Sequence, residues 1–134
     1  MQYAAAIRDA QNDAIETNVG TAPILRVYNG TPPANVAASL SGNTLLAEGT
    51  LPSDWMGASS AGVKAKAGTW TLTGQSGAST GTAGTFFRIY ASDGTTAKIQ
   101  GTFGASGEMV PDNNSIANGQ TVTVSTFSIT RGNG

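Results

Sequence analysis

The stretch "TFFRIYASDGTTAKIQGTF", Thr85–Phe103, decides the fold of this chain. Its first part, Thr85–Ser92, is the most apolar strand pattern in the sequence, and Thr96–Phe103 follows as a second strand pattern. The Asp93-Gly94 pair between them is a tight-turn signal. The stretch therefore predicts an antiparallel β-hairpin, and the segments on either side decide whether further strands join it.

Strand patterns fill the rest of the chain from Ile24 onward, with turn signals between them about every 8–12 residues. No helical pattern separates these strands, which argues against a parallel sheet. Roughly seven or eight strands of this kind predict a mainly-β fold, an antiparallel β-sandwich with jelly-roll-like connections. The further predicted strands are 24–28, 43–51, 61–74 (one long strand, or two broken at Gly68), a short piece at 106–111, and 120–130.

Alternation within these strands predicts which residues share a side of the sheet. In "ILRVY", residues 24–28, Leu25 and Val27 lie opposite the other three residues. In 61–74, Lys64 and Lys66 face away from their apolar neighbours. The alternation of the last strand slips around 125–127, which predicts a β-bulge there.

Residues 2–19 form the one convincing helical pattern, which places an N-terminal helix in 1–20 before a single β-sandwich domain in 21–134. Gly20 is predicted to end the helix, and Pro23 prevents its continuation. The helix has a thin, Ala-rich apolar stripe that suits close packing against a sheet or a second helix. The stripe consists of Tyr3, Ile7, Ala10 and Ala14, with Ile15 and Val19 beside it.

Composition excludes most kinds of catalytic site. The 134 residues include no Cys and no His, so thiolate, Ser-His-Asp and His-metal chemistry are all ruled out. The acidic residues of the β-region form no convincing pair: Glu48, Asp54, Asp93, Glu108 and Asp112. We therefore expect a protein that is not an enzyme, with no catalytic, cofactor-binding or metal-binding residues.

Charge is also sparse. Charged residues make up 11% of the chain, the net charge is −1, and Lys and Arg occur singly. Without a basic stripe we expect no nucleic-acid partner. No stretch approaches the roughly 20 apolar residues of a membrane span, and no signal peptide is visible, so we expect no membrane contact.

Three places are candidates for contacts with other proteins. Tyr3 and Ile7 would contact a neighbouring subunit if the helix reaches across to it. Pro32 and Pro33 turn the chain out of the sheet, and the loop of small residues at 34–43 could then lie on a neighbour. The loop residues Trp55 and Met56 either fill one end of the sandwich or anchor a partner, and the sequence leaves both alternatives open.

Three stretches resemble a group of small virion structural proteins of tailed bacteriophages: "LRVYNGTPPANVAASLSGNTLLAEGTL", "FFRIYASDGTTAKIQGTFG" and "SIANGQTVTVSTFSIT". The resemblance extends over most of the chain, including the helical start. It implies a capsid decoration or cement protein, made in the host cytoplasm, that sits on the outer surface of the virion and bridges neighbouring capsomers. The implied partners are the major capsid protein and copies of the chain itself, as a dimer or trimer.

Two other functions remain open from the sequence. A tail, neck or baseplate component would have the same features as a shell protein. A carbohydrate-binding or receptor-binding module would instead need exposed aromatic rings in a row, and Trp55, Trp70 and Tyr90 are the candidates for that row.

Overall fold

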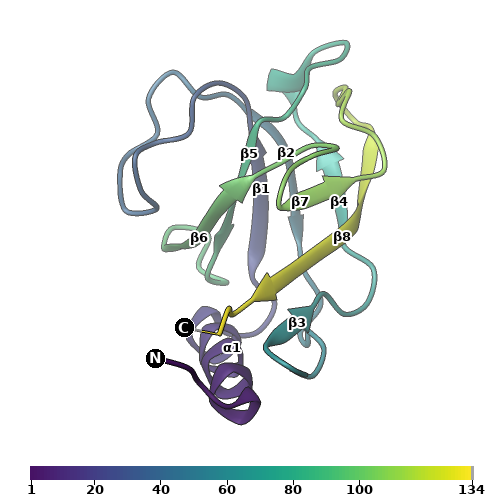
Figure 1. Ribbon diagram of the computed structural model, residues 1–134. Coiled ribbons are helices and arrows are strands. Elements are labelled where there is room, and N and C mark those ends of the chain that lie inside the picture. The colour runs from purple at the N-terminus through teal and green to yellow at the C-terminus, as the bar shows by residue number, and fades with distance from the viewer. Residues whose placement is uncertain (134) are drawn as a thin grey trace.

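The computed structural model describes residues 1–133 and has a mainly-β fold with one N-terminal helix, as the sequence predicts (Figure 1). The predicted helix begins three residues later than expected, and its last residue is the expected one. The elements are α1 (Ala5–Val19), β1 (Ile24–Tyr28), β2 (Leu45–Thr50), β3 (Val63–Ala65), β4 (Thr71–Gly74), β5 (Phe86–Tyr90), β6 (Ala97–Thr102), β7 (Met109–Pro111) and β8 (Thr121–Thr130), with a 3₁₀ turn at Ser76–Ala78.

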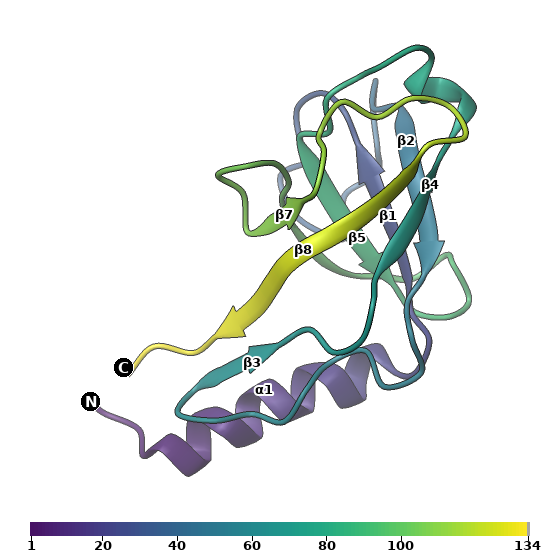
Figure 2. The same cartoon turned by 90° about the vertical axis from the view of Figure 1, so that its right-hand side faces the viewer.

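The eight strands form one antiparallel sheet in the order β3-β8-β4-β2-β1-β5-β6, and β7 also pairs with β8. The sheet is curled, so that β8 crosses in front of β1 and β5 (Figure 2). The ring centroids of Phe87 on β5 and Phe127 on β8 are 5.6 Å apart, although these strands are not neighbours in the sheet. Two parts of one sheet thus face each other across the core, which is compatible with the predicted sandwich.

The predicted hairpin is present as β5 and β6. The carboxylate of Asp93 accepts hydrogen bonds from the backbone N–H groups of Thr95 and Thr96, at 2.8 and 2.9 Å. These bonds, above all the one from Thr96, lower the pKa of Asp93 from 3.8 to about 2. A turn that closes through its own side chain in this way forms from local sequence alone.

The predicted sides of β1 are confirmed, because Leu25 and Val27 lie in the main core. The opposite side of β1 and β5 carries a second, smaller apolar cluster around Tyr28, Phe86 and Tyr90. The hydroxyls of Tyr28 and Tyr90 are 2.9 Å apart, and burial, together with this contact, raises the pKa of Tyr28. A mainly apolar strand pattern is therefore explained by burial on both sides of β5.

The loop at 34–43 covers part of this second cluster rather than extending away from its own sheet. Leu40 packs against the cluster, and Arg88 on β5 donates to the carbonyls of Ala38, at 2.7 Å, and Asn35, at 3.3 Å. The guanidinium of Arg88 is buried and takes the loop backbone as its partner. These residues attach the loop to its own chain, and the contact of the loop with a neighbour stays a prediction, since most of residues 34–43 are exposed.

Two predicted irregularities are confirmed. The pairing of β7 with β8 shifts register between Val110↔Thr126 and Pro111↔Val124, which is the expected bulge in the last strand. The segment 61–74 is two strands, β3 and β4, with Gly68 between them at a φ of +67°.

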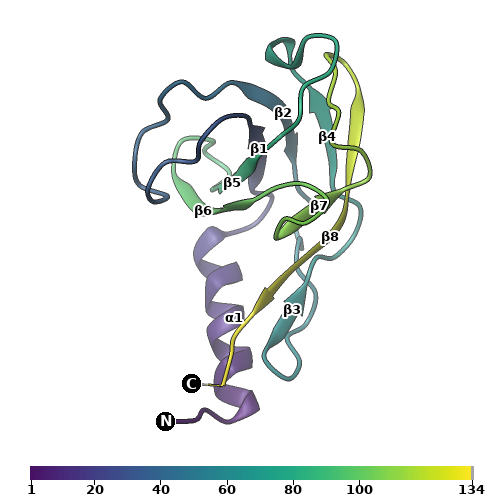
Figure 3. The same cartoon turned by 45° about the horizontal axis from the view of Figure 1, so that its top comes forward.

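α1 projects from one end of the curled sheet, with β3 alongside it (Figure 3). Within residues 1–133, no helix has the length and apolar character needed to cross a membrane.

Candidate protein interface

α1 is attached to its own domain through polar side chains. The backbone N–H of Gly62 donates to the Asp9 carboxylate at 2.7 Å, and the Asn12 amide donates to the carbonyl of Gly62 at 3.0 Å. The Arg8 guanidinium donates to the carbonyls of Ala61 and Arg131 at 3.2 and 3.3 Å. Both backbone polar groups of Gly62, which lies in the turn before β3, are therefore bonded to side chains of the helix.

Lys64 on β3 completes this attachment. Its side chain is only 4% exposed, and its ammonium nitrogen lies 2.8 Å from carboxylate oxygens of both Asp13 and Glu16. Burial alone would lower the pKa of Lys64, but the hydrogen bonds to the two carboxylates outweigh burial and raise it. The hydrogen bond from Lys64 lowers the pKa of Asp13. The charge of Lys64 is thus buried and neutralised at the junction with α1.

This attachment turns the predicted apolar stripe of α1 toward solvent. Tyr3 is 38% exposed and Ile7 is 50% exposed, and Ala10 and Ala14 are exposed as well. The side that packs on the domain instead carries Arg8, Asp9, Asn12 and Glu16, with Ile15 and Val19 at the sheet end. Of the two predicted partners for the stripe, its own sheet is excluded, and a second helix remains.

The exposed stripe is the main apolar surface that the described part of the chain offers. In residues 1–133, the exposed large apolar side chains are Met1, Tyr3, Ile7 and Val63, and three of these four lie on α1 or just before it. Within α1, Ile7, Ala10 and Ala14 follow each other at intervals of three and four residues, and Tyr3 lies just before the helix. This spacing is that of the seam along which two helices pack in a coiled coil.

Trp55 and Met56 lie in the core, which decides between the two alternatives for this pair. Their exposed fractions are 0% and 1%. The indole N–H of Trp55 donates to the carbonyl of Gly20 at 3.0 Å, so Trp55 also fixes the end of α1 to the sheet. The interface role is corrected for both residues, because neither has surface to offer a partner.

The exposed row of rings that a carbohydrate-binding module would need is not formed by the three candidates. Trp55 and Trp70 are fully buried and Tyr90 is 6% exposed. Trp55, Trp70, Phe127 and Phe87 instead contact each other in sequence through the core, with neighbouring ring centroids 5.4–5.9 Å apart. This series of rings joins the loop before β3 to β8 and β5.

The other predicted contact residues lie apart from the stripe. Pro32 is exposed, whereas Pro33 is half-buried and its carbonyl accepts a hydrogen bond from the Gln100 amide at 2.8 Å. Tyr3 and Ile7 are both exposed, Ile7 on α1 and Tyr3 just before it. The attachment of α1 by Gly62 and Lys64 was missed in the sequence, where the only signal was a Lys in a strand and three acidic residues on one helix.

Three of the candidate acidic residues are paired with neighbouring segments of the same chain. Glu48 pairs with Arg26, Glu108 accepts from the N–H of Thr102, and Asp112 accepts from the N–H of Thr123. Within the described residues, no three His, Cys, Asp or Glu side chains gather in a group that could hold a metal ion.

Comparison with protein-family models, with curated proteins and with solved structures gives no significant match in any of the three. Arguments about function therefore rest on the surface of this chain itself.

Proposed function

We propose that this chain is a non-enzymatic structural protein of a virion, a capsid decoration or cement protein that binds the outer shell and stabilises contacts between capsomers. The observation that carries the proposal is the orientation of α1. Its polar side is attached to the domain, and its apolar stripe is left exposed. A helix held in this way is available for contact with another chain.

The composition of the stripe supports contact between copies of this chain. Ala10 and Ala14 let two helix backbones approach closely, while Tyr3 and Ile7 supply larger side chains at the N-terminal end. Apolar side chains buried at the centre of an interface contribute most of its binding energy. The stripe would join two or three copies, as the resemblance to virion structural proteins implies.

The remaining surface supports attachment to a repeated lattice. Because only 11% of residues are charged, covering the surface desolvates few ions. A lattice offers many identical positions, and a joined dimer or trimer can contact several of them at once, which raises its overall affinity.

Addition of the purified protein to shells that lack it tests this proposal. We expect saturable binding at a copy number near that of the major capsid protein and a rise in the temperature at which the shells break. Binding to tails or baseplates alone would move the protein to the tail, and binding to neither would overturn the virion role.

Ile7→Glu places a charge in the stripe and is expected to weaken shell binding at least tenfold, because oligomers lose the advantage of several simultaneous contacts. Ala5→Glu is the matched control, since it adds the same charge at an exposed position on the other side of α1 from Ile7. Equal shell binding by the two variants would contradict the role of the stripe.

A further inference from the structure

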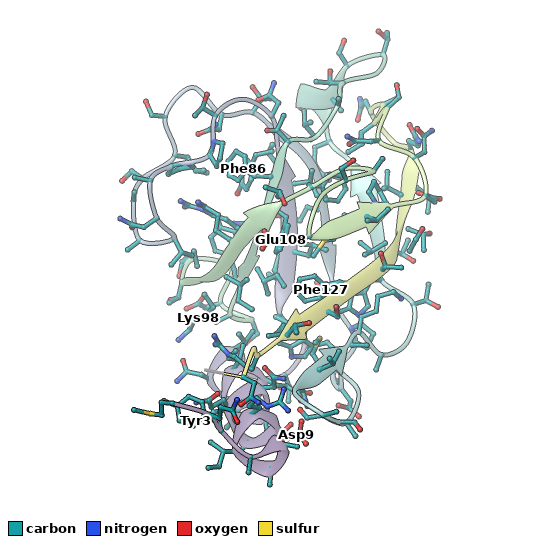
Figure 4. The ribbon with its side chains drawn as sticks, viewed as in Figure 1. Tyr3, Asp9, Phe86, Lys98, Glu108 and Phe127 are labelled. Atoms are coloured by element: carbon teal, nitrogen blue, oxygen red, sulfur yellow. The ribbon has the colours of Figure 1, made fainter. Side chains whose placement is uncertain are left out.

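An open groove of about 880 Å³ lies between β6 and the C-terminal half of β8. Its lining includes Ile15, Ile99 and Ile129, which are the partly buried hydrophobic residues that pack against the main core. Glu108, Phe127 and Lys98 line the groove and are labelled in Figure 4, where Lys98 lies to the lower left of the other two. The groove is therefore a place where the core of the domain reaches the surface.

The β8 side of the groove is an open strand edge. The carbonyl of Phe127 accepts a hydrogen bond from the backbone N–H of Lys66, and the backbone N–H of Arg131 donates to the carbonyl of Gly62. The backbone groups of Phe127 and Arg131 therefore point toward the β3 side. Because this direction alternates along a strand, the backbone groups of Ser128 and Thr130 point the other way, into the groove. Within residues 1–133, β8 pairs with no strand on this side other than β7.

The β6 side is an open edge by the same reasoning. The N–H of Phe103 donates to Thr85, next to β5, whereas the N–H of Thr102 points outward and donates to the Glu108 carboxylate at 2.9 Å. Alternation then directs the backbone groups of Gln100 into the groove. β6 is the last strand of the sheet order, so no strand of the described part of the chain forms a ladder with this edge.

At the β7 end, the space between β6 and β8 is one strand wide. β7 pairs with β8 from Met109 to Pro111, and Met109 also bridges to Phe103 at the end of β6. A single strand thus spans the distance between β8 and β6 at this end. Before β7 the chain turns away at 104–107, where the N–H of Gly107 donates to the carbonyl of Gly104 at 3.0 Å. The groove continues the line of β7 without a strand in it.

The two ends of the groove differ in charge. Lys98 and Arg131 line it together with Ile15 of α1, while Glu108 lines it beside β7. An acidic side chain is therefore favoured at the α1 end and disfavoured at the β7 end.

We propose that this groove binds one extended segment of a partner protein, which adds to the sheet as a strand in line with β7. Its backbone pairs with the open edges at Gln100 and at Ser128 and Thr130. Its alternate side chains are apolar and cover Ile99 and Ile129, and an acidic residue at one end lies between Lys98 and Arg131. This mode is strand addition, in which backbone bonds give affinity and side-chain positions give specificity. The inference does not depend on the virion role or on the stripe of α1.

Two blocked hexapeptides test the inference: Asp-Val-Thr-Val-Thr-Val and its reverse, Val-Thr-Val-Thr-Val-Asp. We expect one of them to bind the full chain and to slow hydrogen exchange at the amides of Ser128, Thr130 and Gln100. N-methylation of alternate peptide nitrogens should weaken that binding at least tenfold, because it removes the donors to one edge. Binding of neither peptide at millimolar concentration, or equal binding of the methylated form, would overturn the proposal.

Variants of the chain provide the matched controls. Ser128→Pro removes the N–H that faces the groove and should abolish binding, whereas Ser128→Ala keeps it and should bind normally. Arg131→Glu should weaken binding of the Asp peptide and favour the same peptide with Lys in place of Asp. If Arg131→Glu still preferred the Asp peptide to the Lys peptide, the placement of the acidic residue beside Arg131 would be overturned. Protection of the same amides without peptide, rising with protein concentration, would show that a second copy fills the groove and would overturn a separate partner.

Discussion

At the scale of single residues, Gly62 carries the attachment of α1. Its φ is +84°, a conformation that L side chains rarely adopt. A Cβ at this position would lie 2.6 Å from an Arg8 guanidinium nitrogen and 2.8 Å from the Arg131 carbonyl oxygen. Glycine is thus required both by the backbone and by the close approach of the helix.

Gly62→Ala is expected to lower the free energy of unfolding by about 1–3 kcal/mol, because the backbone is strained and the helix contacts must shift. Urea denaturation measures this change. Gly132→Ala is the control, since its Cβ would meet nothing within 4 Å, and it should change stability by less than about 0.5 kcal/mol. Equal stability of the two variants would contradict the attachment at Gly62.

Single ionisable residues also set the pH range of stability. The pKa values of Asp13 and Asp93 are lower in the folded chain than their usual 3.8, and the pKa of Lys64 is higher than its usual 10.5. The two carboxyl groups therefore stabilise the fold above pH 3.8, and this contribution is lost as the pH falls below that value, for Asp93 as the pH approaches about 2. Lys64 stabilises the fold below pH 10.5, and its contribution is lost at higher pH.

The midpoint of urea denaturation should accordingly stay level between about pH 5 and 9, where the chain has no His to titrate, and fall on both sides. Asp93→Asn should flatten the acid side, because its side chain does not ionise. A midpoint that changes steeply near neutral pH would contradict this assignment of the ionisable groups.

At the scale of elements, the sequence predicts α1 and the β5–β6 hairpin well, because both are specified locally. Asp93 closes its turn with bonds to residues two and three positions away. The docking side of α1 could not be predicted in this way. Lys64 meets Asp13 across 51 residues of sequence, and the helix buries polar groups where periodicity suggests an apolar contact.

Lys64→Met is expected to loosen α1 from β3, because the half-buried Glu16 carboxylate loses its cation while Asp13 remains largely in solvent. The expected loss is about 1–3 kcal/mol, less than for a fully buried pair. Hydrogen exchange should quicken in α1 more than in β1 and β5. Lys66→Met is the control, since Lys66 makes one exposed hydrogen bond and a 5.9 Å contact with the Trp70 ring but no ion pair. A similar loss in both variants would contradict a specific role for Lys64.

At the scale of the whole molecule, the sequence predicts a mainly-β domain but not the order in which its strands pair. Turn signals and alternation reveal strands, whereas the curl of the sheet follows from contacts such as Phe87 with Phe127, which are far apart in the sequence. For the same reason Trp55 could not be assigned to core or surface until its contacts with Gly20 and Trp70 were visible.

The exposed stripe of α1 makes a direct prediction about the whole molecule in solution. Two copies that pack along Ile7, Ala10 and Ala14 of α1, with Tyr3 just before the helix, would bury apolar side chains that one copy leaves in water. The native mass of the purified chain at micromolar concentration measures this. We expect a dimer or trimer that Ile7→Glu dissociates and Ala5→Glu leaves intact. A chain that stays monomeric up to high micromolar concentration would contradict the role of α1 in assembly.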